Sequence, residues 1–304
     1  MNKWIIAVLV IIGILFLSLI SANILKNEFS EKVSGNKIAL IEINGIISTS
    51  NEDFLSKGSS SDIITGNIRK AAEDNHIKGI LLEINSGGGT VVASEEIVNE
   101  IKIAKEKKPV VAFIREVGAS GAYWAASAAD VIVADPMSLT GSIGVLGSYL
   151  EFSGLLESYN ITYERLIAGN YKDIGTPFKK LNEGERDILQ SKLDLIYNYL
   201  IEDVAKNRNM SLEKTRSLAD GAFYLGIEAK ENGLIDVLGN KETAFNITKE
   251  KANITEAVLV SFKENKGLLD ILSRYMAYSS YYLGRGLSNS FIYEARNKVI
   301  NIRA

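Results

Sequence analysis

The chain has 304 residues, of which 46% are hydrophobic and 23% charged, and its 34 basic and 37 acidic side chains leave a net charge of −3. This is the composition of an ordinary globular protein, so it excludes a disordered or collagen-like chain and a strongly basic nucleic-acid-binding protein. The chain has no cysteine, which excludes disulfides, zinc–thiolate sites, iron–sulfur clusters and thiol nucleophiles. Its single histidine is His76, so any serine–histidine mechanism would depend on that residue.

The first feature in chain order is an uncharged apolar segment at residues 4–25, which follows a short flank at 1–3. A helix of this length covers ~33 Å, enough to cross a hydrocarbon core of ~30 Å. A cleavable signal peptide has a shorter apolar region of roughly 7–15 residues, and a buried core helix would show a polar stripe. We therefore expect an uncleaved, single-pass transmembrane signal anchor. Its orientation does not follow from charge, because Lys3 precedes it and a mixture of Lys and Glu follows.

After a linker at 26–36, segments typical of strands alternate with segments typical of helices. The expected strands are 37–47, 79–84, 110–115, 131–134 and 161–167, and the expected helices are 62–75 (with Asp62 as N-cap), 94–107, 120–129 and 183–207. Apolar strands that alternate with helices predict an α/β fold with a mostly parallel sheet and flanking helices.

A run of three glycines, Gly87 to Gly89, comes directly after the second expected strand. Glycines leave their backbone N–H groups unshielded, and the helix that follows makes such a turn suitable for binding an anion or an oxyanion. A phosphate or dinucleotide loop is the natural rival, but the G-x-G-x-x-G spacing and the Walker lysine are both missing.

Two further turns carry residues with chemical potential. Ser120 lies between Ala119 and Gly121 after the third strand, where it is either a helix N-cap or a serine within reach of a substrate. Lys172 lies in the segment GNYKDIGTPF, where it is either a solvated surface charge or a buried base. Because His76 lies in a polar connection between a helix and a strand, the base for a nucleophilic Ser120 would be a lysine or a carboxylate. A lysine can act as a base only when it is neutral, and burial favours that form.

Four segments in this order and spacing, INSGGGTV, ASGAYWAASAAD, DPMSLTGSIGV and GNYKDIGTPF, resemble the signal peptide peptidases of the SppA (protease IV) type. The resemblance covers roughly residues 38–250 and implies a ClpP/crotonase-like fold and a membrane-anchored serine protease. It departs from the usual family pattern at Gly87, where the family has proline, and this makes the turn more flexible.

The resemblance also implies the roles of individual residues. It makes Ser120 the nucleophile and Lys172 the general base of a Ser–Lys dyad. The amide of Gly89, with Gly88 next, would pair with the amide of Gly121 as the oxyanion hole, and Ser142 would orient the lysine. No cofactor and no metal are expected.

The resemblance further implies residual signal peptides or unfolded apolar peptides as substrates, a homo-oligomer, and a catalytic domain outside the cytoplasm, held at the cell membrane. No nucleic-acid partner is expected. In domain terms, we expect the peptidase domain at 37–250 and a C-terminal extension at 251–304. The apolar and tyrosine residues of that extension would pack on a neighbouring subunit, on the core or on the membrane surface.

Two other interpretations remain open at this point. One is a crotonase-type acyl-CoA enzyme, which would use the glycine turn for a thioester oxyanion but has no need of both Ser120 and Lys172. The other is a non-catalytic membrane-anchored scaffold, which would be expected to have lost one of those two residues.

Overall fold

The computed structural model describes residues 35–49 and 59–262, together with Gly13 and Ser18. The expected transmembrane segment at 4–25 therefore lies outside the described residues, apart from those two positions. The same holds for 263–304, the larger part of the expected C-terminal extension. Among the described residues, no helix is both long enough and apolar enough to cross a membrane.

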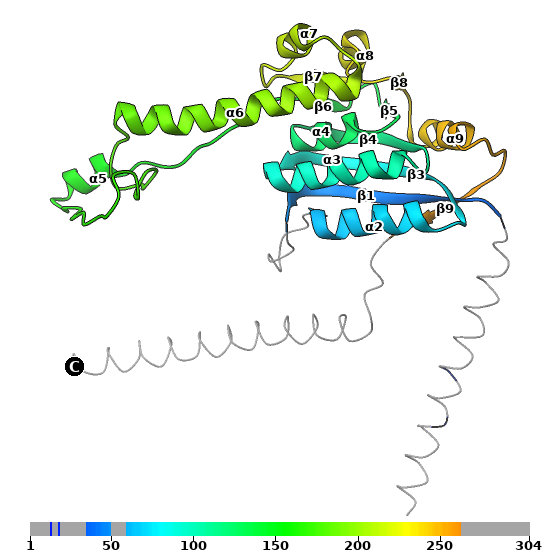
Figure 1. The fold of residues 1–304 in the computed structure, drawn as a ribbon, viewed down its shortest axis with the longest axis horizontal. Coiled ribbons are helices and arrows are strands. Elements are labelled where there is room, and N and C mark those ends of the chain that lie inside the picture. The colour runs from blue at the N-terminus through cyan, green and yellow to red at the C-terminus, as the bar shows by residue number, and fades with distance from the viewer. Residues whose placement is uncertain (1–12, 14–17, 19–34, 50–58, 263–304) are drawn as a thin grey trace, which may run out of the picture. The chain divides into compact units, whose positions relative to one another are not determined.

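The described chain is organised around one nine-stranded sheet with the order β2-β1-β3-β4-β5-β8; β9 pairs with β1, and β6 pairs with β4 and β7 (Figure 1). The strands are β1 (Lys37–Ser48), β2 (Ser59–Ser60), β3 (Ile77–Gly89), β4 (Val110–Ala119), β5 (Val131–Ala134), β6 (Leu139–Gly141), β7 (Phe223–Leu225), β8 (Val237–Leu238) and β9 (Val258–Ser261). Only the β6–β7 pair among these described strands is antiparallel. The predicted α/β class with a mostly parallel sheet is confirmed.

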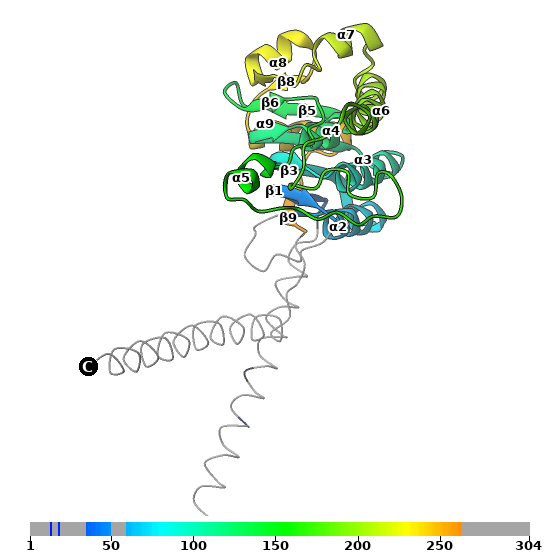
Figure 2. The ribbon, with the colours of Figure 1, turned by 90° about the vertical axis from the view of Figure 1, so that its left-hand side faces the viewer.

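The helices lie beside this sheet or extend beyond it. They are α2 (Ser61–Glu73), α3 (Val91–Lys105), α4 (Gly121–Ser127), α5 (Ser153–Ser158), α6 (Glu183–Arg208), α7 (Leu212–Ser217), α8 (Gly226–Asn232) and α9 (Lys241–Lys251). Figure 2 shows α2, α3 and α6 together on one side of the strands.

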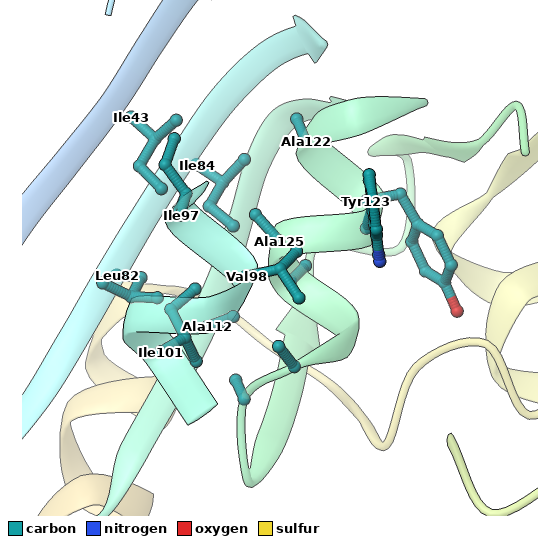
Figure 3. Packing of buried hydrophobic residues seen from close by; sticks show 14 of the residues in the cluster. Ile43, Leu82, Ile84, Ile97, Val98, Ile101, Ala112, Ala122, Tyr123 and Ala125 are labelled. Carbon is teal, nitrogen blue, oxygen red and sulfur yellow. The ribbon is translucent and has the colours of Figure 1, made fainter. Parts of the chain in front are cut away.

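Alternate residues of each central strand enter two separate cores, because successive side chains of a strand point to opposite faces. In β1, Ile41 and Ile43 join the larger core with α2, α3, α4 and α6, while Ile38 and Leu40 join a smaller core with α9. Figure 3 shows the larger core, in which Ile97 and Ile101 of α3 lie against the strands. Burial on both faces explains why these strands are almost continuously apolar.

Four of the five expected strands are confirmed, as parts of β1, β3, β4 and β5. The fifth is wrong: residues 161–167 form no regular secondary structure and are exposed throughout. An apolar run becomes a strand only where a neighbouring strand takes up its backbone hydrogen bonds, and none of the strands that the structure describes pairs with this run. The predicted N-cap is also displaced, because α2 begins at Ser61 and its N-cap is Ser60 instead of Asp62.

The described sheet also extends past residue 250. Strand β9 pairs in parallel with β1 through Val258 to Ser261, and the compact unit that contains the sheet ends at Phe262. The expected start of the C-terminal extension at 251 thus falls before the last strand of the sheet.

Residues 142–182 lead from the end of β6 out of the sheet to the start of α6, and we call this segment the arm. After β6 the chain has no regular structure as far as α5, and it then turns back to α6 through a series of turns. In Figure 1 the arm runs from the sheet to the N-terminal end of α6, and α5 lies near that end, on the side away from α4.

Candidate active site

Ser120 occupies the junction between the end of β4 and the start of α4. Its backbone has φ 54° and ψ −124°, a conformation that costs a residue with a side chain on the order of 1–3 kcal/mol. Two hydrogen bonds hold it there: its N–H donates to the Gly141 carbonyl oxygen, and its own carbonyl accepts from the Trp124 N–H, both at 2.9 Å.

Ser120 lines two hollows on the surface, and its side chain does not cap the helix that follows. The Ser120 side chain makes no capping hydrogen bond to α4, so the structure does not support a simple N-cap role. The junction resembles the strained strand–serine–helix turn of a nucleophile elbow, although Gly121 directly after the serine breaks the G-x-S-x-G spacing. The geometry is suited to an exposed nucleophile.

The glycine turn at the end of β3 packs directly against this junction. Gly88 has φ +97°, and a methyl group added to it would lie 2.8 Å from the Gly121 nitrogen and 3.0 Å from the Ser120 Cβ. Only glycine fits such an approach without strain. The Gly88 N–H donates to the Ser86 hydroxyl at 3.1 Å, so a ligand would have to compete for it.

The amides of Gly89 and Gly121 come together on the other side of the turn. A methyl group on Gly121 would lie 3.5 Å from the Gly89 nitrogen and 2.2 Å from the Ser94 hydroxyl. In the described part of the chain, the Gly121 N–H donates to no protein acceptor. Two converging amides next to a serine hydroxyl are what stabilises the oxyanion of an acyl-transfer reaction.

Ser142 follows β6 and lies in the same cleft as Ser120. It also has a positive φ, 47°, and its N–H donates to the Ala222 carbonyl oxygen at 2.8 Å. Its hydroxyl donates to the Gly221 carbonyl oxygen at 3.1 Å. The structure therefore brings Ser142 to Ser120, while its expected role in orienting a lysine is not tested.

Ser120 lies between two hollows. The larger is an open cleft of about 760 Å³ between the first part of the arm and the face of α6 that bears Gln190, Leu193 and Tyr197. The smaller is a pocket of about 160 Å³, and Gly89, Ser120 and Gly121 lie on its wall. The rest of the small pocket is mostly apolar: Val91, Trp124, Val145, Leu146, Ile196 and Leu200.

Lys172 does not line either hollow. Its side chain is exposed, and it lies in the arm, between α5 and α6. The arm segment that carries it lies beyond the far end of α6 in Figure 1. Of the six residues expected at the site, the structure brings together Ser120, Ser142 and the three glycines, and it leaves Lys172 apart.

His76 is exposed in the turn before β3, whereas the glycine turn is at the other end of that 13-residue strand. At ~3.3 Å per residue the two ends are roughly 40 Å apart, so His76 of the same chain cannot serve Ser120. Within residues 35–49 and 59–262, no three His, Asp or Glu side chains form a group that could hold a metal ion.

Helix α6 contributes to the site, which the sequence pattern does not indicate. Trp124 of the small pocket donates its indole N–H to Asp203 of α6 at 2.7 Å, and Lys102 of α3 pairs with the same carboxylate at 2.5 Å. These contacts fix α6 over α4. The amphipathic pattern of 183–207 predicts a helix with one buried face, but nothing in it indicates which helix it meets.

Comparison with known proteins also indicates a peptidase. The chain matches peptidase family S49 over residues 102–255. It is 34% identical to a putative protease of Methanocaldococcus jannaschii over 296 residues, which cover 94% of this chain and 93% of that protein. It is 35% identical to a putative signal peptide peptidase SppA of Enterococcus faecium, with 81% and 72% covered. It is also 33% identical to the chloroplastic serine protease SPPA of Arabidopsis thaliana, with 78% and 36% covered.

Proposed function

The chain belongs to peptidase family S49 and is a serine-type peptidase, and from this premise we propose that it is a membrane-anchored endopeptidase that cleaves residual signal peptides or other unfolded apolar peptides. In this proposal Ser120 is the nucleophile and Lys172 the general base. The observation that carries it is the strained junction at Ser120, an uncapped serine that lines the open cleft and lies beside Gly89 and Gly121.

The proposed reaction is acyl transfer in two steps. The neutral amine of Lys172 takes the proton of the Ser120 hydroxyl as Oγ attacks the peptide carbonyl. The amides of Gly89 and Gly121 stabilise the tetrahedral oxyanion. The lysine then gives its proton to the leaving amine, and a water that the same lysine deprotonates hydrolyses the ester on Ser120.

We infer that Lys172 reaches Ser120 of a second copy of the chain. Lys172 is exposed and lies outside the hollows around the serine of its own chain. An exposed ammonium is stabilised by water, so a lysine becomes a useful base only where another surface covers it. Large apolar side chains of the arm are exposed as well, among them Leu150, Tyr159 and Leu166. Such a surface is typical of a protein–protein interface, and a homo-oligomer would bury it.

The small pocket supports the proposed class of substrate. It lies on the same side of Ser120 as the Gly89 and Gly121 amides, so a carbonyl held there would place the adjacent side chain in or near it. Its volume of about 160 Å³ and the six apolar side chains among its lining residues suit one aliphatic or aromatic side chain. Signal peptides are rich in such side chains.

The expected anchor at 4–25 supports the proposed attachment to the membrane. A tether at the membrane would keep the active site close to peptides left in the bilayer. We propose that the catalytic domain is held at the cell membrane on its non-cytoplasmic side, where signal peptides are released.

The test compares the purified full chain with its Ser120→Ala and Lys172→Ala variants on an unfolded protein and on a signal-peptide-like substrate. Loss of at least about 10³-fold in kcat is expected for each, with unchanged thermal unfolding. If all three preparations cleave equally, the activity belongs to a contaminant, and a scaffold role gains support. If only the serine variant is inactive, the nucleophile is correct and the base is another residue.

A further inference from the structure

Four charged residues join the loop around Lys172 to the start of α6, and we call them the loop cluster: Arg165, Asp173, Lys179 and Glu185. Arg165 holds both carboxylate oxygens of Asp173, through Nε and, at 2.7 Å, through Nη2. Lys179 lies 3.5 Å from the same carboxylate and also pairs with Glu185. The cluster has two positive and two negative members, so its charges balance.

The two carboxylates of the loop cluster are sheltered from solvent, whereas the Arg165 side chain is 36% exposed. The side chain of Glu185 is 1% exposed and that of Asp173 is 11% exposed. The Arg165 guanidinium holds the pKa of Asp173 down at about 2, and Lys179 lowers the pKa of Glu185 in the same way. Both carboxylates are therefore ionised wherever the enzyme could work, and a bidentate Arg–carboxylate pair fixes orientation as well as distance.

Glu185 connects the cluster to a rigid element. It is the third residue of α6, and it completes a capping box with Asn182: the Asn182 side chain accepts from the Glu185 N–H at 2.8 Å, and the Glu185 carboxylate accepts from the Asn182 N–H at 3.1 Å. The carboxylate that ends the chain of ion pairs is thus fixed at the first turn of a 26-residue helix.

The loop that carries Lys172 has little else to hold it. Gly169 and Gly175, with φ +98° and +79°, lie at its two ends, and glycine adopts many alternative conformations at such positions. Between them, short turns such as Lys172 N–H to the Gly169 carbonyl oxygen, 3.1 Å, supply the backbone hydrogen bonds. Within this fully described loop, Asp173 is the residue whose side chain makes an ion pair, and it is the direct neighbour of Lys172.

We propose that the loop cluster positions Lys172: it fixes the loop against α6 so that the amine is presented in one place to the active site. This rests on the proposed function, in which Lys172 is the base. Its members touch neither the serine nor the substrate, so they act through Lys172 and are positioning residues. A displacement of about 1 Å at a catalytic group can cost 10²-fold in rate, and the freedom of two glycines is ample for that.

The test uses the full chain with Asp173→Asn, which keeps the shape of the side chain and removes its charge. We expect kcat to fall by about 10- to 100-fold while KM stays within about twofold, since neither hollow beside Ser120 is altered. Asp187→Asn is the matched control: it removes the same charge from an exposed position in the first turns of α6, and it should behave as the wild type. Lys172→Ala sets the scale for complete loss of the base.

A second pair of variants keeps the test decisive if Asp173→Asn unfolds or changes its hydrodynamic size. Arg165→Gln removes the partner of Asp173, whereas Arg165→Lys keeps the charge and loses only the bidentate geometry. Positioning predicts a graded kcat, wild type above Arg165→Lys above Arg165→Gln, at equal thermal unfolding temperature and equal size. Equal kcat values in these two variants would overturn it.

The failures of this inference and of the proposed function are distinguishable. If Lys172→Ala is inactive while Asp173→Asn keeps more than half of the wild-type kcat, the loop cluster does not position the base, and the Ser–Lys mechanism stands. If Lys172→Ala retains wild-type activity, the proposed mechanism is wrong, and the positioning role is wrong with it.

Discussion

At the carboxyl end of β3 the chain packs so closely that a methyl group on Gly89 would lie 1.8 Å from the Ile47 carbonyl oxygen, whereas in the arm large apolar side chains face solvent. Leu166 of the arm is 99% exposed, while Ala119 and Ala122 on either side of the serine turn are 1% and 0% exposed. The glycine turn leaves almost no space for a larger side chain. The arm, in contrast, exposes apolar surface that its own chain does not cover.

The difference matches the different requirements of the two proposed catalytic residues, Ser120 and Lys172. The serine turn and its two amides need fixed distances, and a parallel sheet supplies them because the carboxyl ends of β3, β4 and β6 meet at one edge. Lys172 must be shielded from solvent to act as a neutral base, but the arm of a single chain leaves it exposed. A second copy would cover the arm and complete the site at the same time.

After loss of Ser120 or Lys172 itself, the largest effect should come from adding a methyl group to the closely packed glycine turn. Gly88→Ala forces a positive φ on an alanine and brings its Cβ to 2.8 Å from the Gly121 nitrogen. We expect kcat on a fluorogenic peptide to fall by about 10²- to 10³-fold, the cost of losing an oxyanion donor. Gly87→Ala is the control in the same turn, because its Cβ would meet nothing within 4 Å. Equal kcat values in the two variants would show that the turn does not shape the oxyanion hole.

The dependence of the rate on pH tests the role of Lys172 as a base without any substitution. If Lys172 acts as a neutral amine, the rate should rise with pH by up to about tenfold per pH unit while the ammonium form predominates. The loop cluster does not contribute to this slope: the depressed pKa of Asp173, about 2, means that its share of stability is present above the unfolded pKa and is lost only as the pH falls toward 2. Full activity at pH 5 with a flat profile would contradict the lysine base.

A charge on the apolar surface of the arm should weaken assembly more than folding. Leu166→Asp changes an exposed side chain, so thermal unfolding of the separated chain should hardly change. The activity per chain should fall by more than about tenfold in dilute solution and recover at higher protein concentration. Ile103→Asp places the same charge on an exposed position of α3, which is 50% exposed, and should have no such effect. The same concentration dependence in both variants would show that the apolar surface of the arm has no specific role in assembly.

The smallest expected effect is a change of preference at the small pocket. Ile196→Ala enlarges the pocket at a half-buried position. We compare kcat/KM for two substrates, one with phenylalanine and one with alanine at the cleavage site, and we expect the ratio of the two values to change by about tenfold. Leu195→Ala, at the neighbouring exposed position of α6, is the control. An unchanged ratio in Ile196→Ala would mean that the pocket does not hold the side chain next to the scissile bond.

The sequence predicts the sheet better than it predicts the arm, for a physical reason. Strands buried on both faces are marked by continuous β-branched runs, such as 37–47 and 79–84, and the structure contains them. Residues 161–167 have the same local character, but whether a run becomes a strand depends on a neighbour, which the local pattern does not contain.

The site shows the same limit. Glycine and serine motifs identify the serine turn, because its conformation depends on residue type at Gly88 and Gly121. They say nothing of the small pocket, since the meeting of Trp124 with Ile196 and Leu200 depends on the packing of α6. Nor do they place Lys172, whose distance from Ser120 follows from the direction in which a segment without regular structure leaves the sheet.

Mixing two inactive variants shows whether the nucleophile of one chain works with the base of another. Full-length Ser120→Ala and Lys172→Ala chains are co-expressed in equal amounts, and cleavage is compared with that of each variant alone. If each site takes Ser120 from one copy and Lys172 from the next, random assembly leaves about one quarter of the sites intact. We expect recovery of about that fraction of wild-type activity. No recovery from a correctly assembled mixture would mean that the two residues do not come from different copies.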